Sequence, residues 1–147
     1  MLPCTFTHQT ILLFAEAKLG ATPGAGGVQK LARHIGRGKA IEWIMLARHV
    51  DATEAAAAGL ATKVVEPDEL EAASLDLARQ LMDLSPMALA QCKVSIHLSG
   101  DVDLRSARRF GVEALSALVG SADWLEGMSA FVEKRKPAFA PVQERKD

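Results

Sequence analysis

Residues 16–31 read EAKLGATPGAGGVQKL, and no other stretch constrains the fold as much. Pro23 and the glycines around it favour tight turns, because they adopt backbone conformations that other residues avoid. The residues that follow have a helical pattern up to Ile35, and Gly36 ends it. The unpaired N–H groups at the start of such a helix form a positive pole. Glu16 lies shortly before this helix, so it is a candidate for proton transfer.

The glycines do not fit either of the common nucleotide-binding loops. A phosphate-binding loop ending at Gly38-Lys39 needs Ser or Thr next, where Ala40 stands, and its first glycine would be Arg33. A dinucleotide fingerprint that starts at Gly24 needs glycine or alanine at Gln29. The glycine loop therefore predicts another kind of site.

The rest of the chain predicts a mostly helical protein with one or two short strands. Residues 62–65 (TKVV) are the best strand candidate, because they are rich in β-branched side chains. Residues 1–13 have strand-forming residues but no clear alternation, which leaves either a short strand or an atypical leader. Beyond the helix that ends at Ile35, helices are expected at residues 38–47, 52–58, 67–84, 86–98, 102–118 and 122–134.

Polar residues predict where several of these helices begin. Asp51 with Glu54 resembles a capping box, Ser85-Pro86 is typical of a helix start, and Ser121 is expected to cap the last helix. Apolar spacing places Ile41, Ile44 and Met45 on one side of a helix. It gives the helix at residues 67–84 an apolar face formed by Leu70, Leu77, Leu81 and Leu84. In the helix at residues 102–118, the buried positions are expected to be Leu104, Phe110, Leu115 and Leu118.

Composition narrows the class of protein. The 147 residues are 49% hydrophobic and 24% charged, which indicates a folded globular chain. The net charge of −1 provides no basic field for nucleic acid. No apolar run is long enough for a bilayer, so no membrane partner is expected. The apolar residues 11–15 follow no basic residue, which argues against a signal peptide.

The chain has two cysteines, Cys4 and Cys92, which is too few for a disulfide framework and fits a reducing compartment. A cytoplasmic location is therefore expected. Neither Cys4 with His8 nor Cys92 with His97 makes a four-ligand zinc set, so no metal is expected. Cys92 falls in a predicted helix, where a small buried hydrophobic residue is the expected role.

Three stretches resemble motifs of the enoyl-CoA hydratase/isomerase (crotonase) family. Residues 23–31, PGAGGVQKL, resemble the family signature PGAGGTQRL. Residues 59–65, GLATKVV, resemble the family segment A-x-x-x-G-L-V-x-x-V-V, and residues 126–137, EGMSAFVEKRKP, resemble EGMxAFxEKRxP. Glu16 stands seven residues before Pro23, the position of a catalytic glutamate in the family. The resemblance covers about residues 14–140.

The resemblance implies an α/β fold that is mostly helical, the C-terminal part of a crotonase-like ββα spiral with a helical trimerisation region. Residues 1–13 would be the atypical leader or residual strand, residues 14–84 the partial spiral core, and residues 85–147 the helical oligomerisation region. A homotrimer or a dimer of trimers is implied for the complete protein.

The resemblance also implies the chemistry. Glu16 would be the acid/base that exchanges a proton with the α-carbon of an acyl-CoA thioester. Pro23, Gly24, Gly26 and Gly27 would shape the wall beside that carboxylate, and Lys134 matches a lysine near the CoA nucleotide. The reaction would be hydration of a 2-enoyl-CoA or a double-bond shift, between which Glu16 alone does not decide. No cofactor is implied, since CoA is part of the substrate.

In the family pattern, a first glutamate and the two N–H donors of the oxyanion hole come before the position of Met1. The expectation is therefore a truncated chain whose activity is impaired, because removal of a single such donor costs about 2.7–4 kcal/mol in other enzymes. The alternative is a non-catalytic assembly module or an unproductive fragment, which would associate through exposed apolar faces.

Overall fold

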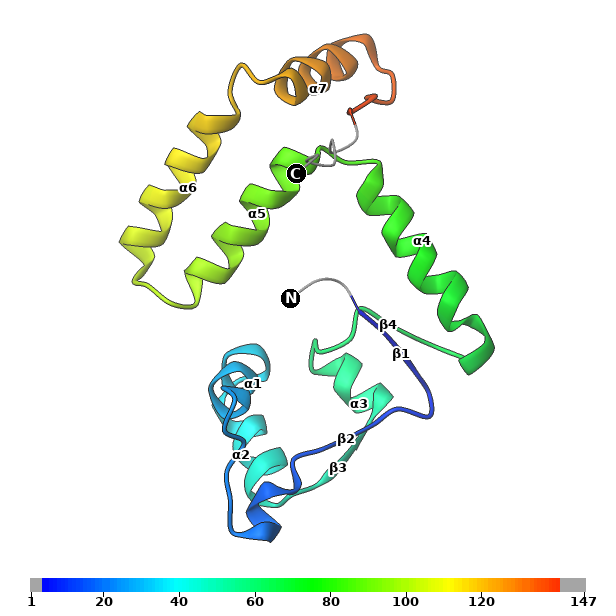
Figure 1. Cartoon of the computed structure of the whole chain (residues 1–147), viewed down its shortest axis with the longest axis vertical. Coiled ribbons are helices and arrows are strands. Elements are labelled where there is room, and N and C mark those ends of the chain that lie inside the picture. The colour runs from blue at the N-terminus through cyan, green and yellow to red at the C-terminus, as the bar shows by residue number, and fades with distance from the viewer. Residues whose placement is uncertain (1–3, 141–147) are drawn as a thin grey trace, which may run out of the picture. The chain divides into compact units, whose positions relative to one another are not determined.

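The computed structural model describes residues 4–140 (Figure 1). Residues 1–3 and 141–147, which belong to the first and last predicted segments, lie outside the described residues. The described residues form two compact units, residues 4–76 and residues 77–140. The boundary between them falls within one helix, α4 (Leu70–Met82).

Four short strands form two pairs in the first unit. β1 (Thr5–Thr7) lies parallel to β4 (Lys63–Val65), with Phe6 opposite Val64. β2 (Ile11–Leu13) lies antiparallel to β3 (His49–Asp51), with Leu12 opposite Val50. The predicted strand at residues 62–65 is confirmed as β4, and the described residues 4–13 contain the two strands β1 and β2. β3 was missed, because three residues are too few to show an alternating pattern.

In the first unit, a glycine ends one helix and an aspartate caps the start of another. α1 (Gly27–Ile35) ends at Gly36, whose φ of +83° favours glycine, and α2 (Arg37–Met45) follows at once. α3 (Ala52–Ala57) begins after Asp51, whose carboxylate accepts a hydrogen bond from the Glu54 amide at 2.8 Å. The other helical segments are η1 (Ala15–Leu19) and η2 (Pro67–Glu69), which leads into α4.

The core of the first unit lies between α1, α2, α3 and the β2–β3 pair. Its buried residues are Leu31, Ala40, Trp43, Val50 and Ala55. Of the three apolar residues expected on one side of α2, Ile44 packs against this core, whereas Ile41 is 55% exposed and Met45 is 70% exposed. α2 packs against α1 and η1. The residue of α2 that this packing buries completely is Trp43, which belongs to the same core cluster as Leu31 of α1.

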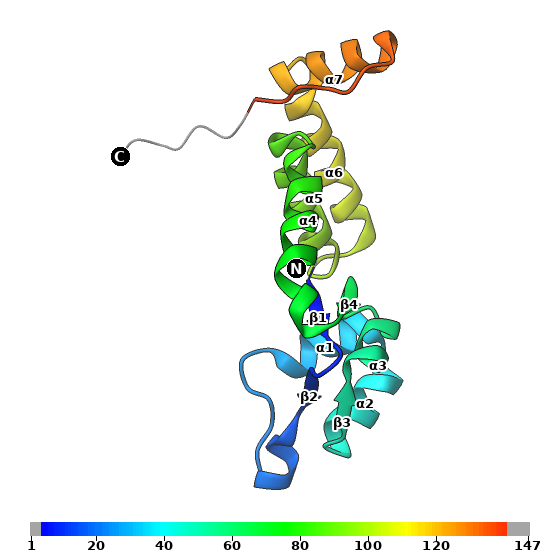
Figure 2. The same cartoon turned by 90° about the vertical axis from the view of Figure 1, so that its right-hand side faces the viewer.

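The second unit contains α5 (Pro86–Ser99), α6 (Leu104–Leu118) and α7 (Ala122–Glu133). The side chains of Ser85, Asp103 and Ser121 accept hydrogen bonds from backbone amides in the first turns of these helices, so the predicted caps at residues 85 and 121 are confirmed. α5 and α6 lie side by side in both views of the chain (Figures 1 and 2).

The second unit buries small side chains more completely than the predicted large ones. Ala114 and Ala130 are buried. Of the predicted residues, Phe110 and Leu118 are half-buried, whereas Leu104 is 74% exposed and Leu115 is 52% exposed. Cys92 is exposed too, so its predicted role as a core residue was wrong. A helix covered on one side buries only a narrow strip, which leaves the remaining apolar residues in solvent. Within residues 4–140, no helix combines the length and the apolar character needed to cross a membrane.

Candidate active site

Glu16 lies in η1, a short 3-10 helix that follows β2. The helix ends at Gly20, whose φ of +72° favours glycine, and the amide of Ala21 donates to the backbone oxygen of Glu16 at 2.9 Å. η1 packs against α2, which belongs to the core of the first unit. The hydrogen bond from Ala21 and the packing of η1 on α2 therefore both restrain the backbone of Glu16.

One carboxylate oxygen of Glu16, Oε2, is buried and has no hydrogen-bond partner among the described residues. The residue as a whole is half-buried, so the carboxylate is partly covered and not sealed from solvent. Buried polar atoms are nearly always hydrogen-bonded in proteins, and an exception calls for an explanation. A carboxylate oxygen kept free of protein donors is available to a proton on a bound molecule.

The loop after η1 turns tightly into α1. Pro23 is buried, and the amide of Gly26 donates to the backbone oxygen of Gly24 at 2.6 Å. Gly26 has a φ of +80°, and a Cβ on Gly27 would lie only 3.1 Å from the Cβ of Pro23. These two positions favour glycine for different reasons: the first because of its backbone conformation, and the second because of the close approach of Pro23.

The start of α1 has no side-chain cap. Gly26, its N-cap residue, offers no side chain, and the first turn contains no acidic residue. The first N–H groups of a helix have no partner within the helix and carry partial positive charge. This end of α1 therefore suits an anion or a polarised carbonyl oxygen.

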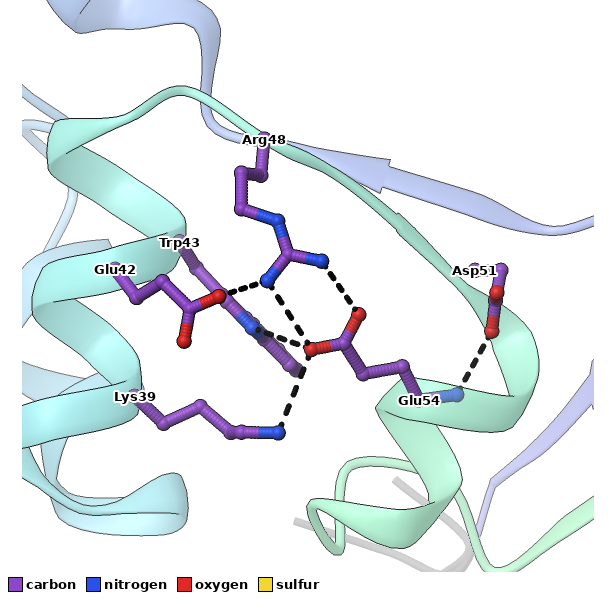
Figure 3. A network of polar contacts seen from close by, with 6 residues as sticks. All are labelled: Lys39, Glu42, Trp43, Arg48, Asp51 and Glu54. Carbon is purple, nitrogen blue, oxygen red and sulfur yellow. Dashed lines mark hydrogen bonds and ion pairs between the residues drawn. The ribbon is translucent and has the colours of Figure 1, made fainter.

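A polar network joins α2, the helix that contacts η1, to α3. Figure 3 shows its side chains. The carboxylate of Glu54 accepts hydrogen bonds from Trp43 Nε1 at 3.1 Å, from Arg48 Nη2 at 3.0 Å and from Lys39 Nζ at 3.4 Å. Arg48 also pairs with Glu42. Burial raises the pKa of Glu54, but the hydrogen bonds from Trp43 and Lys39 and the charge of Arg48 outweigh it, so the pKa lies below its usual value.

The network corrects part of the predicted capping box. Asp51 caps α3 as expected, but the side chain of Glu54 does not return to the backbone of Asp51. It turns to Trp43 and two cations instead, since those donors offer a carboxylate more than one backbone amide does. No spacing pattern indicated these partners, because residues 43 and 54 belong to different helices.

Lys134 lies in the second unit, as the residue that ends α7. It is exposed and has a φ of +55°, which few residues other than glycine adopt. The predicted site residues thus fall into two groups. Glu16, Pro23, Gly24, Gly26 and Gly27 form one continuous stretch of the first unit, and Lys134 belongs to the second unit.

The cysteine and histidine pairs show no metal-binding arrangement in the part of the chain that is described. Residues 4–140 contain no group of three His, Cys, Asp or Glu side chains able to hold a metal ion. The thiol of Cys4 donates to the backbone oxygen of Leu60 at 3.0 Å, which gives it a structural role beside β1.

The protein belongs to the crotonase fold class. Its short strands, its many helices and the glycine loop before α1 agree with this class, and a solved structure supports it. The crystal structure of an enoyl-CoA hydratase from Bacillus anthracis superposes with a TM-score of 0.87 at 34% sequence identity, covering 92% of this chain and 52% of that one. The chain belongs to the enoyl-CoA hydratase/isomerase family, whose model matches residues 7–142.

Curated relatives agree with this assignment. A probable mitochondrial enoyl-CoA hydratase of Dictyostelium discoideum is 38% identical over 124 residues, which are 84% of this chain and 45% of that protein. A short-chain-enoyl-CoA hydratase of Clostridium acetobutylicum is 38% identical over 121 residues, or 82% of this chain and 46% of that protein. The chain spans about half the length of the curated relatives it matches.

Proposed function

We propose that Glu16 is the proton-transferring carboxylate of a site for 2-enoyl-CoA thioesters. One observation carries this proposal: in a chain of the enoyl-CoA hydratase/isomerase family, the buried oxygen of Glu16 has no hydrogen-bond partner among residues 4–140. The glycine loop that follows begins the helix α1 without a side-chain cap. A free carboxylate and an uncapped helix start in one segment suit proton transfer next to a thioester carbonyl.

Two reactions use this carboxylate in the same way. In hydration, the oxygen of water bonds to the β-carbon while one of its O–H bonds breaks and its proton leaves. The electron pair of the double bond moves toward the thioester, and the α-carbon then gains a proton, so that one molecule of water is added in all. In a double-bond shift, a proton leaves one carbon and another returns to a second carbon. Glu16 exchanges the proton at the α-carbon in both, so the choice between hydratase and isomerase stays open.

We propose no metal and no redox cofactor. Water addition and proton shifts change no overall oxidation state, so they need no redox cofactor. CoA enters as part of the substrate. Pro23, Gly24, Gly26 and Gly27 form the wall along which the thioester approaches, and the absence of side chains at the glycines supports a close approach. Lys134, an exposed cation, contacts a phosphate of the CoA nucleotide.

The complete protein is proposed to be a homotrimer or a dimer of trimers that acts in fatty acid metabolism in the cytoplasm. Exposed apolar residues on α6 and α7, such as Leu104 and Phe131, support association. Light scattering on the purified chain tests this proposal. A monomer at all concentrations would contradict it.

A spectroscopic assay tests the reaction. The purified chain is given crotonyl-CoA, and the absorbance of the conjugated thioester is followed over time. Glu16→Gln keeps the size of the side chain but removes the carboxylate, and Glu71→Gln makes the same change at an exposed position of α4. A loss of absorbance that Glu16→Gln abolishes and Glu71→Gln retains would support the proposal.

The second candidate is a non-catalytic assembly module, or an unproductive fragment of such an enzyme. The apolar side chains exposed on α6 and α7 favour it, because they provide surface for association without any chemistry. If the chain consumes crotonyl-CoA no faster than its Glu16→Gln variant, the hydratase assignment fails for this chain. Association in light scattering would then favour the assembly module.

A further inference from the structure

The chain turns back along α7 directly after Lys134. The amide of Lys134 donates to the backbone oxygen of Phe131 at 3.3 Å, and the amide of Arg135 donates to that of Ala130 at 3.0 Å. This is the bonding of a helix end whose last residue is left-handed, a position that glycine usually takes. Figure 2 shows the following residues, in orange to red, running back beside the helix. A lysine with a φ of +55° therefore stands at a sharp, defined turn.

The carboxylate of Glu126, on α7, binds two residues of the segment that follows this turn. Its Oε1 accepts from Arg135 Nη1 at 2.6 Å and its Oε2 from Arg135 Nη2 at 3.1 Å, so the guanidinium and the carboxylate meet as two forks. Oε1 also accepts from the amide of Ala138 at 2.7 Å. One side chain thus binds the residue directly after Lys134 and a second residue three positions further on.

Two further contacts keep the returning segment in place. The ring of Phe139 lies against Gly127, where an added Cβ would meet it at 3.8 Å. Arg135 Nε donates to Glu133 Oε2 at 2.6 Å, on the other side of the turn. Side-chain contacts therefore hold the chain on both sides of Lys134: Glu133 before it, and Arg135 and Ala138 after it.

We call the contacts of Glu126 with Arg135 and Ala138 the clamp. The side chain of Lys134 takes no part in it. Lys134 is exposed, and within residues 4–140 its ammonium forms no ion pair. The cation two positions on, Lys136, differs in this respect, because its Nζ pairs with Asp83 at 2.7 Å. Of these two nearby lysines, Lys136 is therefore paired with a carboxylate, and Lys134 is not paired with one among residues 4–140.

We propose that Glu126 is a positioning residue for Lys134: by holding Arg135 and Ala138 it fixes the turn from which the Lys134 ammonium reaches a phosphate of the CoA nucleotide. This inference rests on the proposed function, since it takes acyl-CoA as the ligand. Fixing the turn lowers the entropy that Lys134 loses on binding, so the clamp contributes to affinity without touching the ligand.

Titration of the full chain with CoA, followed by calorimetry, tests the proposal. Lys134→Ala is expected to raise the Kd for CoA roughly two- to fivefold, the range of an exposed charge contact. Glu126→Gln should raise the Kd by a similar factor, and the double variant should be no weaker than Lys134→Ala alone. The matched control Lys136→Ala removes a cation that Asp83 already engages, and it should leave the Kd nearly unchanged.

Amide hydrogen exchange provides a readout that needs no ligand. Exchange at Ala138 should become faster in Glu126→Gln and stay slow in Lys134→Ala. If Glu126→Gln does not fold, Arg135→Lys takes its place, because lysine keeps the charge and loses the fork. That variant should show both the faster exchange and the weaker binding.

The outcomes separate this inference from the proposed function. Weaker CoA binding in Lys134→Ala but not in Glu126→Gln would overturn the positioning role and leave the proposed function standing. A further loss on adding Glu126→Gln to Lys134→Ala would show that Glu126 acts without Lys134, and would overturn it too. No CoA binding by the unaltered chain would overturn the proposed substrate class, and this inference with it.

Discussion

The indole nitrogen of Trp43 donates a hydrogen bond to Glu54 Oε1 at 3.1 Å, across the space between α2 and α3. The indole ring itself is fully buried, and the ammonium of Lys39 lies 5.6 Å from its centre. One side chain therefore packs the core of the first unit and also anchors its main polar network. Because η1 packs on α2, this contact helps to fix the segment that carries Glu16.

Substitution of Trp43 should show this double role. Trp43→Ala is expected to lower the free energy of unfolding by about 3–5 kcal/mol, because a large buried ring is lost. Trp43→Phe keeps most of the ring and removes the N–H donor, so it should cost less. Urea unfolding followed by circular dichroism measures both. Trp124→Phe in the half-buried face of α7 is the matched control and should cost least.

The hydrogen bond can be isolated with a double-mutant cycle. Trp43→Phe and Glu54→Gln each remove one partner of the contact, so the combined loss should be smaller than the sum of the two losses. Strict additivity, measured in the same urea experiments, would mean that the contact between Trp43 and Glu54 contributes nothing of its own.

Stability should fall in acid because three carboxylates of residues 4–140, those of Glu54, Asp103 and Glu126, have lowered pKa values. Hydrogen bonds from Arg135 and from the amide of Ala138 lower the pKa of Glu126 from 4.5 to about 2. The pKa of Glu54 is lowered as well. A carboxylate whose pKa is lower in the folded state stabilises the fold above its unfolded pKa and loses this contribution as the pH falls through the folded pKa.

The free energy of unfolding should therefore decrease as the pH is lowered from about 5 to about 2. Glu126→Gln should be less stable than the unaltered chain at pH 7, and its stability should depend less steeply on pH within this window. Urea unfolding at a series of pH values measures both effects. Parallel curves for the two proteins would show that Glu126 does not contribute to the acid dependence.

Two glycines should respond to alanine in opposite directions. A Cβ on Gly27 would lie 3.1 Å from the Cβ of the buried Pro23, so Gly27→Ala should destabilise the chain by about 1–3 kcal/mol. Gly111 lies inside α6 with no atom within 4 Å of an added Cβ, so Gly111→Ala should stabilise it by up to about 1 kcal/mol. Thermal unfolding distinguishes the two signs. A Gly27→Ala variant as stable as the unaltered chain would contradict the role of Pro23, and a destabilised Gly111→Ala variant would contradict the open space at Gly111.

Local features of the fold could be predicted because they depend on neighbouring residues. Gly36 ends one helix, Ser85 begins another, and the Val64-Val65 pair forms a strand, each for reasons visible within a few positions. The pairing of β1 with β4 was not predictable in this way. Thr5 and Lys63 are far apart in sequence, and no local pattern specifies their register.

Buried faces and side-chain partners were harder to predict for the same reason. Apolar spacing put Ile41 and Met45 on one side of their helix, but both are exposed, and Trp43 is the residue of that helix that is fully buried. For the candidate site, the family motifs indicated Glu16, the glycine loop and Lys134, yet not what braces them. Glu126 and Arg135 both lie within a recognised motif, and only the turn after α7 brings their charged groups together.

Ser85 offers a last test, because it makes two contacts where a simple cap makes one. Its Oγ accepts from the amide of Ala88 at 3.1 Å and donates to Asp123 Oδ2 at 2.5 Å, which joins the start of α5 to the start of α7. Ser121 only caps α7, by accepting from the amide of Trp124 at 3.2 Å. Ser121→Ala should therefore cost about 1 kcal/mol, and Ser85→Ala about 2 kcal/mol. Both losses are measurable by urea unfolding, and equal losses would mean that the bond to Asp123 adds no stability.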